Sequence, residues 1–538
     1  MADTVREIER KYEAPDDGRL PEPAVVAEVA GVAEVVDKGV ATLDATYYDT
    51  LDQRLAADGI TLRRRTGGGD AGWHLKLPAG PDARDEIRAP LSDTLPAELA
   101  ALVRSRVRDR ALVPLVRLVS ERNVRHLLDA DGTLLAELSA DRVTARRLTP
   151  RTGEPVGWTE VETELGPGGD PAFLDALESR LTEAGLRRSA AASKLARALA
   201  ETGVAITADQ AGKASKAGKA DKTDKTGKGG KAGKKGKKGK KAAEPTAGDV
   251  VLDYVRAQIA AIVSLDPAVR LDVPDSVHRM RVATRRLRSC FRSYRKVLDR
   301  AVTDPIGDEL KWLAGELGID RDREVLTARI EERLGEVPVE LRLGPVSARL
   351  RIWSQTSRRG SRERLIGVLD GERHLALLDS LAALSADPPL RPAAARPAEE
   401  VILAAVLRDD ERLATLVTAA LAAPGGRDRD VAVHEARKKA KRVRYAAEAA
   451  RPVLGKPAKA FADLMTGLQE LLGDHQDSVV ARQALRELAV QAHGAGESAF
   501  TFGLLYGREE ARAAAREREL PALWAEVSRE EHRTALRP

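Results

Sequence analysis

The pentapeptide Glu7-Ile8-Glu9-Arg10-Lys11 stands near the start of the chain and alternates in character from one residue to the next. In an extended strand, Glu7, Glu9 and Lys11 project from the same face, with about 6.8 Å between successive side chains. Two carboxylates beside an ammonium group suit a metal ion together with an anion better than they suit an ordinary solvent-facing surface. This stretch therefore predicts a strand that faces a polar site.

Alternating runs continue for about 200 residues, a span that predicts a β-barrel or sandwich of short antiparallel strands. The runs lie near 60–65, 73–77, 124–128, 134–138 and 158–165, with Gly/Asp turns such as 67–70 between some of them. Two further stretches, near 25–36 and 171–184, look helical. Within the runs, these sets share a strand face by parity: Arg63 with Arg65, His74 with Lys76, and Glu160 with Glu162 and Glu164. Because barrel strands alternate inside and outside, all these charged sets can face one lumen.

Such a lumen, with carboxylates on one wall and Arg or Lys on the others, is what metal-assisted phosphate chemistry requires. Mg²⁺ and Mn²⁺ take oxygen ligands and bridge carboxylates to phosphate oxygens. Arginine and lysine neutralise the remaining phosphate charge. Any single strand would also fit a half-exposed sheet whose polar face meets water, but the ordered set of strands favours the lumen.

These motifs resemble the CYTH domain of the triphosphate tunnel metalloenzymes, whose signature is matched by Glu7 to Lys11. The resemblance continues in the family's order to Ser193-Lys194. It implies an eight-stranded antiparallel tunnel that binds a triphosphate with divalent metal. Residues expected to hold metal are Glu7, Glu9, Glu160, Glu162 and Glu164, with the choice among the last three left open. Residues expected to bind phosphates are Lys11, Arg63, Arg65, Lys76, Arg122 and Lys194, and those expected to act in catalysis are Glu7, Glu9 and Lys11.

The implied reaction is in-line attack of water on a terminal phosphorus, with a lumen carboxylate as proton acceptor. Substrates of the family include inorganic triphosphate, thiamine triphosphate and ATP. A nucleotide base or thiazolium ring usually needs an aromatic platform, and aromatic residues make up only 3% of the chain. We therefore expect inorganic triphosphate as the substrate. A class IV-type adenylate cyclase and a non-catalytic polyphosphate-binding or targeting protein are the alternatives.

The C-terminal half is rich in Ala, Leu, Arg and Glu, which predicts helices, and it contains a repeat. Residues 277–288 and 433–444 both read V-H-x-x-R-x-x-x-[R/K]-R-x-R. A second motif follows each copy at matching spacing, as Leu317-Gly318-Ile319-Asp320-Arg321-Asp322 and as Leu472-Gly473-Asp474-His475-Gln476-Asp477. Two linked motifs at the same spacing indicate an internal duplication, and hence an all-α domain with pseudo-twofold symmetry.

On a helix, the basic residues of each copy advance by three or four positions, so they form a stripe about 15 Å long. Pairing of the two stripes would give a basic groove for an extended anion. The motifs resemble the CHAD domain, a helical domain with signature histidines that often follows a CYTH domain. This resemblance implies binding of inorganic polyphosphate and association with polyphosphate granules, with Asp322 and Asp477 orienting basic side chains. The residues expected to bind polyphosphate are His278, Arg281, Arg285, Arg286, Arg288, His434, Arg437, Lys441, Arg442 and Arg444.

Between the two halves lies a segment that sets the sign of the chain's net charge of +6. Thirteen lysines and two aspartates fall between Ala211 and Lys241, and no large apolar residue occurs in 210–246. Such a composition predicts a flexible, self-repelling linker. The linker could also contact nucleic acid non-specifically. A nucleic-acid-binding protein is a further alternative, although the basic stripes lack the interleaved aromatic residues on which single-strand binders stack bases.

The sequence as a whole predicts a two-domain α+β protein. We expect a tunnel domain over 1–204, a Lys-rich linker over 205–246, and a helical polyphosphate-binding domain over 247–538. One cysteine, Cys290, excludes a disulfide scaffold, and no apolar run is long enough to span a bilayer. We therefore expect a cytoplasmic, metal-dependent triphosphatase with Mg²⁺ or Mn²⁺ as cofactor, inorganic triphosphate and polyphosphate as partners, and no membrane contact.

Overall fold

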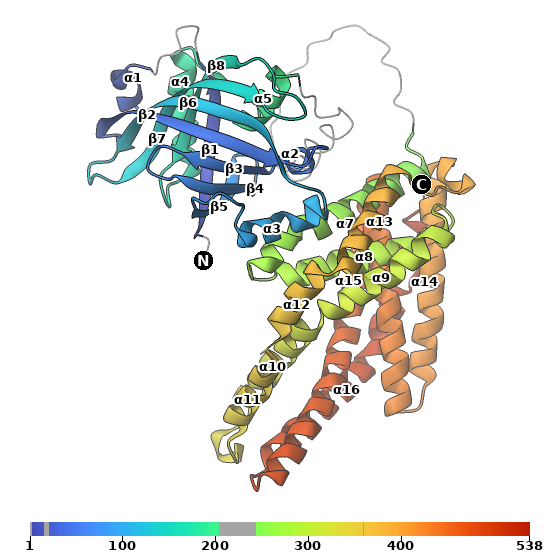
Figure 1. Ribbon diagram of the computed structural model, residues 1–538. Coiled ribbons are helices and arrows are strands. Elements are labelled where there is room, and N and C mark those ends of the chain that lie inside the picture. The colour runs from blue at the N-terminus through green and yellow to red at the C-terminus, as the bar shows by residue number, and fades with distance from the viewer. Residues whose placement is uncertain (1–2, 15–20, 204–243, 359, 538) are drawn as a thin grey trace. The chain divides into compact units, whose positions relative to one another are not determined.

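The computed structural model describes residues 3–14, 21–203, 244–358 and 360–537, and the chain divides into two compact units, Met1–Lys234 and Lys235–Pro538. Most of the Lys-rich segment lies outside the described residues, so its expected flexibility and nucleic-acid contact stay predictions. Over the described residues, Figure 1 shows strands with short helices in the first unit and helices alone in the second.

The first unit is built on a closed antiparallel β-barrel, as the sequence predicts. Eight strands follow one another around the barrel in the order β1-β5-β4-β3-β2-β6-β7-β8, and β8 pairs with β1 again. The two-residue β9 extends the end of β1. The strands are β1 (Asp3–Glu13), β2 (Glu34–Asp49), β3 (Thr61–Thr66), β4 (Gly72–Pro78), β5 (Ala83–Pro90), β6 (Val113–Leu128), β7 (Leu134–Arg147), β8 (Val156–Leu165) and β9 (Arg187–Arg188).

Alternation along each strand separates a polar lumen from an apolar outer wall. On β7, for example, Ala136 and Leu138 are fully buried on the outer face, while Glu137 and Asp141 point the other way. Short helices cover part of the outer wall with leucines such as Leu177. These helices are α1 (Pro23–Ala27), α2 (Arg54–Ala57), α3 (Ala97–Val107), α4 (Pro171–Glu183) and α5 (Lys194–Glu201). The barrel thus buries apolar residues outside and charges inside.

The helical expectation for 171–184 is confirmed by α4, whereas that for 25–36 is largely wrong. In the latter region only α1 is helical, and it ends at Ala27. Gly31 follows at φ 95°, in the left-handed region that interrupts a right-handed helix. From Glu34 the chain then continues as β2, because β6 offers it a full ladder of hydrogen bonds.

The second unit is all helical and surrounds one large apolar core. The longest helix, α15, contains a break at Gly455, whose φ of 60° lies in the left-handed region. The helices are α7 (Ala247–Arg270), α8 (Ser276–Ser293), α9 (Arg300–Glu316), α10 (Ile319–Gly335), α11 (Val346–Arg358), α12 (Ser361–Asp370), α13 (Glu372–Ala386), α14 (Ala398–Ala422), α15 (Arg427–Gly494), α16 (Phe500–Val527) and α17 (Glu530–Thr534), with 3₁₀ turns at Val339–Leu341 and Pro392–Ala395.

Each copy of the repeat lies on one of the long core helices, the first on α8 and the second on the N-terminal part of α15. The motif that follows the first copy begins α10, and the one that follows the second lies further along α15. In the described part of the chain, every helix is too short or too polar to cross a membrane.

Candidate functional site

The lumen of the barrel contains a cavity of about 420 Å³. Nearly all the charged residues that the sequence assigns to a tunnel line it, from five different strands and the start of α5. They are Glu7, Glu9, Lys11, Arg63, Arg65, Lys76, Arg122, Glu162, Glu164 and Lys194. Glu160 alone of the expected set is absent from the lining, and its carboxylate accepts a hydrogen bond from Trp158 Nε1 at 2.7 Å.

Strand register explains why these groups meet. On the two neighbours of β8, Lys11 of β1 lies opposite Glu162, and Asp141 of β7 lies opposite Glu160. Asp141 also lies opposite Arg122 of β6. Residues directly opposite on antiparallel strands have their Cβ atoms about 5 Å apart, so each pair can interact across the sheet.

A cluster of three carboxylates, from Asp141, Glu160 and Glu162, surrounds the ammonium group of Lys194. The Nζ atom lies 3.0 Å, 2.8 Å and 2.5 Å from their respective oxygens. Ser193 caps α5 by accepting a hydrogen bond from the Ala196 amide at 3.0 Å, which places Lys194 at the first position of that helix. The lysine thus enters the lumen from the end of a fixed helix.

Arg122 and Lys11 also form hydrogen bonds and ion pairs with this carboxylate cluster. Arg122 donates two hydrogen bonds to Asp141, at 2.8 Å and 2.7 Å, and one to Glu162 at 2.8 Å. Lys11 pairs with Glu162 and lies 3.2 Å from Glu9. Although burial disfavours a charged carboxylate, Lys194 and Arg122 lower the pKa of Asp141 below its usual value.

A second network occupies the wall formed by β1, β4 and β5. Glu7 accepts from Lys76 and, at 3.3 Å, from Arg88. Glu86 lies 2.9 Å from His74 Nδ1 and pairs with Arg88. Four of these five side chains line the cavity, and His74 contacts the lining residue Glu86, so the polar interior continues around the barrel.

Crowding of like charges leaves two other lumen groups with strongly shifted pKa values. Burial, with the carboxylates of Glu7 and Glu9, raises the pKa of Glu164 to about 7. Burial and the neighbouring Arg63 and Arg122 lower the pKa of Arg65 to about 9. Among the described residues, Glu164 has no cation within ion-pair distance, and Arg65 pairs with Asp70 but also faces the like charges of Arg63 and Arg122. A bound cation near Glu164 and a bound anion near Arg65 would therefore favour the charged form of each group.

The donor set also fits a divalent metal. Oxygen atoms of Asp141, Glu160 and Glu162 all lie within 4.8 Å of one another. Carboxylate oxygens are the ligands that Mg²⁺ and Mn²⁺ prefer, and the ammonium ion among them already marks the position as favourable for a cation.

Sequence reasoning missed Asp141 and Glu86 as members of the site. Asp141 shares parity on β7 with Glu137, which lies in the alternating run near 134–138, so extending that run would have found it. The place of Glu86 in the site depends on the register of β5 against β4, where it lies opposite Lys76.

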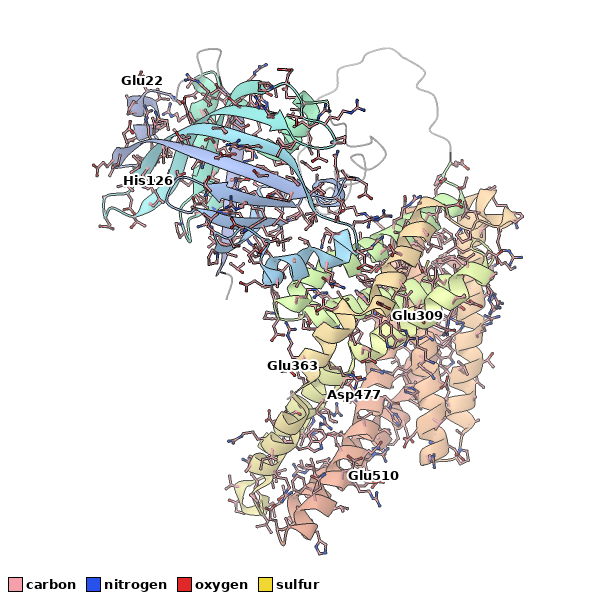
Figure 2. The ribbon with its side chains drawn as sticks, in the orientation of Figure 1. Glu22, His126, Glu309, Glu363, Asp477 and Glu510 are labelled. Atoms are coloured by element: carbon pink, nitrogen blue, oxygen red, sulfur yellow. The ribbon has the colours of Figure 1, made fainter. Side chains whose placement is uncertain are left out.

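In the helical unit, each basic stripe is tied to the second motif of its own copy. Arg281 donates two hydrogen bonds to Asp322, at 2.5 Å and 2.9 Å. Its counterpart Arg437 lies 3.8 Å from Asp477, which is labelled on α15 in Figure 2. The glycine of each motif faces the same guanidinium, since a Cβ on Gly318 would lie 2.8 Å from Arg281. Both aspartates therefore contact the arginine of their own copy, and their orienting role stays a prediction.

The middle residues of the stripes face one another. Arg285 of α8 lies close enough to Arg437 and Lys441 of α15 for each to affect the others electrostatically. Burial, together with Arg285 and Arg437, lowers the pKa of Lys441 to about 7. The pairing of stripes expected from the duplication therefore produces a half-buried concentration of positive charge.

The remaining stripe residues do not join this group. Arg286 and Arg444 flank Tyr445 and pair with Glu448, whereas Arg288 and Arg442 line a separate cavity. The two histidines also differ: His278 is exposed, and His434 Nδ1 lies 2.7 Å from Gln476.

Comparisons with known proteins agree with this architecture. The family model described as the CYTH domain matches residues 5–199, and that described as the CHAD domain matches residues 253–486. The uncharacterised protein Rv2226 of Mycobacterium tuberculosis is 36% identical over 530 residues, covering 95% of this chain and 94% of its own. Members of the CYTH family include triphosphatases and cyclases and depend on divalent metal.

Two solved structures resemble parts of the chain. PptA from Streptomyces chartreusis has 22% identity and a TM-score of 0.44, and the match covers 52% of this chain and 99% of PptA. The CHAD domain from the plant Ricinus communis has 25% identity and a TM-score of 0.43, covering 53% of this chain and 92% of that domain. With the two domain matches and the full-length relative, the chain belongs to the family of proteins that join a CYTH domain to a CHAD domain.

Proposed function

We propose that the barrel hydrolyses inorganic triphosphate with Mg²⁺ or Mn²⁺, and that the helical unit binds inorganic polyphosphate. The observation that carries the first half is the composition of the lumen. One cavity of about 420 Å³ is lined by carboxylates from β1 and β8 and by Arg or Lys from β3, β4, β6 and α5. Metal-bound phosphate needs both kinds of group within reach of one molecule.

The carboxylates of Asp141, Glu160 and Glu162 would hold a divalent metal, as their spacing allows. When bound, the metal would polarise phosphate oxygens and lower the pKa of a coordinated water. Arg63, Arg65 and Lys76 would bind the phosphates along the opposite wall, and burial would keep their interactions strong. A carboxylate of the lumen would accept the proton of the attacking water.

A substrate without an organic part suits this cavity. Among the described residues that line it, Tyr47 is the only aromatic one, and its hydroxyl accepts a hydrogen bond from Arg63 at 3.3 Å. This ring is held by a phosphate-binding residue and is a poor platform for a base. Inorganic triphosphate therefore fits better than ATP.

The observation that carries polyphosphate binding is the meeting of the two stripes. Arg285 and Lys441 have no carboxylate within ion-pair distance in the described part of the chain, and both are held near Arg437. Half-buried cations without a carboxylate in ion-pair distance favour a polyanion, and an extended phosphate chain can follow both stripes.

The test of catalysis is phosphate release from inorganic triphosphate, ATP and long-chain polyphosphate, with Mg²⁺ or Mn²⁺ and with EDTA. We expect metal-dependent turnover of triphosphate well above ATP. Glu162→Gln should lower the rate about a hundredfold or more, because it weakens the carboxylate cluster. Glu121→Gln is the matched control, since Glu121 lies on β6 with its side chain 60% exposed, outside the lumen.

Three other results would each replace this proposal. Formation of cyclic AMP from ATP would make the barrel a cyclase. Absence of release from all substrates, with polyphosphate binding retained, would make the chain a non-catalytic binding protein. Preference for DNA over polyphosphate at matched salt would contradict the second half of the proposal.

A further inference from the structure

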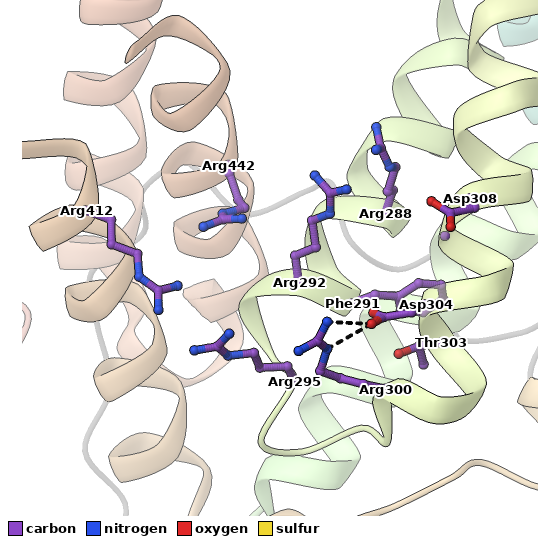
Figure 3. Close-up of a pocket in the computed structure, with 11 residues that line it drawn as sticks. Arg288, Phe291, Arg292, Arg295, Arg300, Thr303, Asp304, Asp308, Arg412 and Arg442 are labelled. Carbon is purple, nitrogen blue, oxygen red and sulfur yellow. Dashed lines mark hydrogen bonds and ion pairs between the residues drawn. The ribbon is translucent and has the colours of Figure 1, made fainter. Parts of the chain in front are cut away.

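A second cavity, of about 310 Å³, opens in the helical unit where α8, α9, α14 and α15 come together. Figure 3 shows arginine side chains from all four helices around it. We call it the arginine cleft. The arginines that line it are Arg288, Arg292, Arg295, Arg300, Arg412 and Arg442.

Acidic side chains neutralise only part of this charge. Arg300 donates to Asp304 at 2.9 Å and 2.6 Å, drawn as dashed lines in Figure 3, and Arg442 donates to Asp409 at 3.0 Å. Within the described residues, the other four arginines have no carboxylate within 4.0 Å of their nitrogens. Burial and the nearby Arg292 lower the pKa of Arg288, although Asp308 acts in the opposite sense.

The duplication provides an internal comparison for the cleft. Aligning the repeats on His278 and His434 pairs Arg288 with Arg444 and Arg286 with Arg442. Further along the helices it pairs Arg292 with Glu448, a cation with an acid, and Ser289 with Tyr445, a small side chain with an aromatic one.

In the second copy, Glu448 and Tyr445 both contact the arginines around them, so the charge of those arginines is balanced and the space between them is filled. Glu448 lies 2.9 Å from Arg286 and 3.7 Å from Arg444. The guanidinium groups of the same two arginines lie 5.6 Å and 4.8 Å from the Tyr445 ring centroid. Two arginines there contact an acid and a ring, whereas the aligned positions of the first copy carry Arg292 instead of the acid and Ser289 instead of the ring, and Arg292 lines the arginine cleft.

We propose that the arginine cleft is a second binding site for inorganic phosphate chains, present on one side only of the pseudo-twofold axis. This inference rests on the polyphosphate binding proposed above. Planar guanidinium forks match the oxygens of phosphate, and several converging forks suit adjacent phosphates. The volume lies near the lower end for ligand pockets and suits a few phosphate groups.

The cleft also continues the basic stripes. Arg288 is the last stripe residue of the first copy, Arg442 belongs to the second copy, and both line the cleft. Arg292 follows Arg288 by one turn of α8. A phosphate chain that lies between Arg285 and Lys441 can therefore extend into the cleft. Because the cleft exists on one side only of the pseudo-twofold axis, the chain would extend in one direction only.

The test is equilibrium binding of long-chain polyphosphate and of inorganic triphosphate to the full chain over a range of salt concentrations. Arg292→Glu installs the acid of the second copy, and Arg412→Glu makes the same charge change from α14. Both positions are exposed, so the fold should survive. Arg351→Glu is the control, because Arg351 is an exposed arginine of α11 outside the cleft. We expect each cleft variant to lower the affinity for long-chain polyphosphate about tenfold, with a shallower salt dependence, and the control to change it less than about twofold.

Arg285→Ala separates the two proposals. If the wild-type chain binds no polyphosphate, both are overturned. If Arg285→Ala weakens binding while Arg292→Glu and Arg412→Glu behave like Arg351→Glu, the arginine cleft alone is overturned. If the cleft variants bind long-chain polyphosphate more weakly but still bind triphosphate normally, the cleft is the place where a long chain continues. If they bind long-chain polyphosphate and triphosphate more weakly, the cleft is a site for free short chains as well.

Discussion

Replacing Lys194 with methionine should make the stability of the barrel dependent on divalent metal. The Lys194 ammonium lies within 3.0 Å of Asp141, Glu160 and Glu162, and all four side chains are at most 11% exposed. Methionine fills similar space without the charge. The three carboxylates would then face one another with Arg122 and Lys11 as their remaining cations.

The loss of stability in Lys194→Met can be bounded by the cost of protonating one carboxylate and by the cost of leaving it charged without a partner. At pH 7, a carboxylate with an ordinary pKa near 4 can become neutral at a cost of about 4 kcal/mol. Removing one partner of a buried ion pair costs about 3–5 kcal/mol, which is the same range. We therefore expect the variant to lose about 3–5 kcal/mol in the free energy of unfolding of the barrel in the presence of EDTA.

Mg²⁺ should restore much of this loss, because it would take the position of the ammonium among oxygen ligands. At a hundredfold excess over its dissociation constant, a ligand adds about 2.7 kcal/mol. Scanning calorimetry with and without Mg²⁺ measures the change, and hydrogen exchange of β7 and β8 assigns it to the barrel. Arg197→Met is the matched control, since Arg197 lies on the same helix and contacts the Trp158 ring instead of the carboxylates. Equal stabilisation of wild type and Lys194→Met by Mg²⁺, or an unchanged stability in EDTA, would refute the reasoning.

Three further changes test the helical unit. With the Lys441 pKa at about 7, this side chain is largely neutral at pH 8 and should take up about one proton when polyphosphate binds. Titration calorimetry in two buffers measures this proton uptake, and Lys441→Arg should abolish it. Equal proton uptake by the wild type and the variant would contradict the prediction. Gly318→Ala should displace Arg281 and weaken polyphosphate binding, whereas Gly473→Ala, with its nearest guanidinium atom at 3.5 Å instead of 2.8 Å, should have little effect in the same titration. Burial and Arg270 lower the pKa of His374 to about 4, so the contribution of this residue to stability is complete above pH 6.5 and is lost as the pH falls toward 4. Between pH 7 and pH 5, urea denaturation should therefore show the wild type losing about 2 kcal/mol in free energy of unfolding that His374→Gln retains. Equal losses in the two proteins would contradict this prediction.

The sequence was most informative where parity or periodicity alone sets the position of a side chain. On β1, alternation places Glu9 and Lys11 on the lumen face whatever the partners of the strand are. The duplicated stripes were predictable for the same reason, because a helix with this spacing must carry its basic residues on one side. Repeats at equal spacing also made the pairing of two helices a reasonable expectation.

Contacts that depend on strand order were harder to predict. Asp141 and Glu160 face each other only because β7 pairs with β8 in one particular register, which local sequence does not specify. Glu164 was expected to bind metal with the same weight as Glu160 and Glu162. In the structure it stands apart from the carboxylate cluster and opposite Glu9 on β1. The division of the stripes was also unpredictable, because Arg286 pairs with Glu448 while Arg285 lies near enough to Lys441 to lower its pKa.

Charge balance in the lumen has a consequence for the proposed reaction. Glu162 and Asp141 are already paired with Lys11, Arg122 and Lys194. A triphosphate that enters must attract these cations away from the carboxylates, and the carboxylates would then be left buried and uncompensated. A divalent metal bound by the same carboxylates removes that cost, so each ligand makes the binding of the other more favourable. Metal and triphosphate should therefore bind cooperatively, with each raising the affinity of the other by the same factor. Titration of triphosphate at several Mg²⁺ concentrations measures this factor, and a triphosphate affinity that does not change with Mg²⁺ would show that the lysines and arginines do not exchange partners in this way.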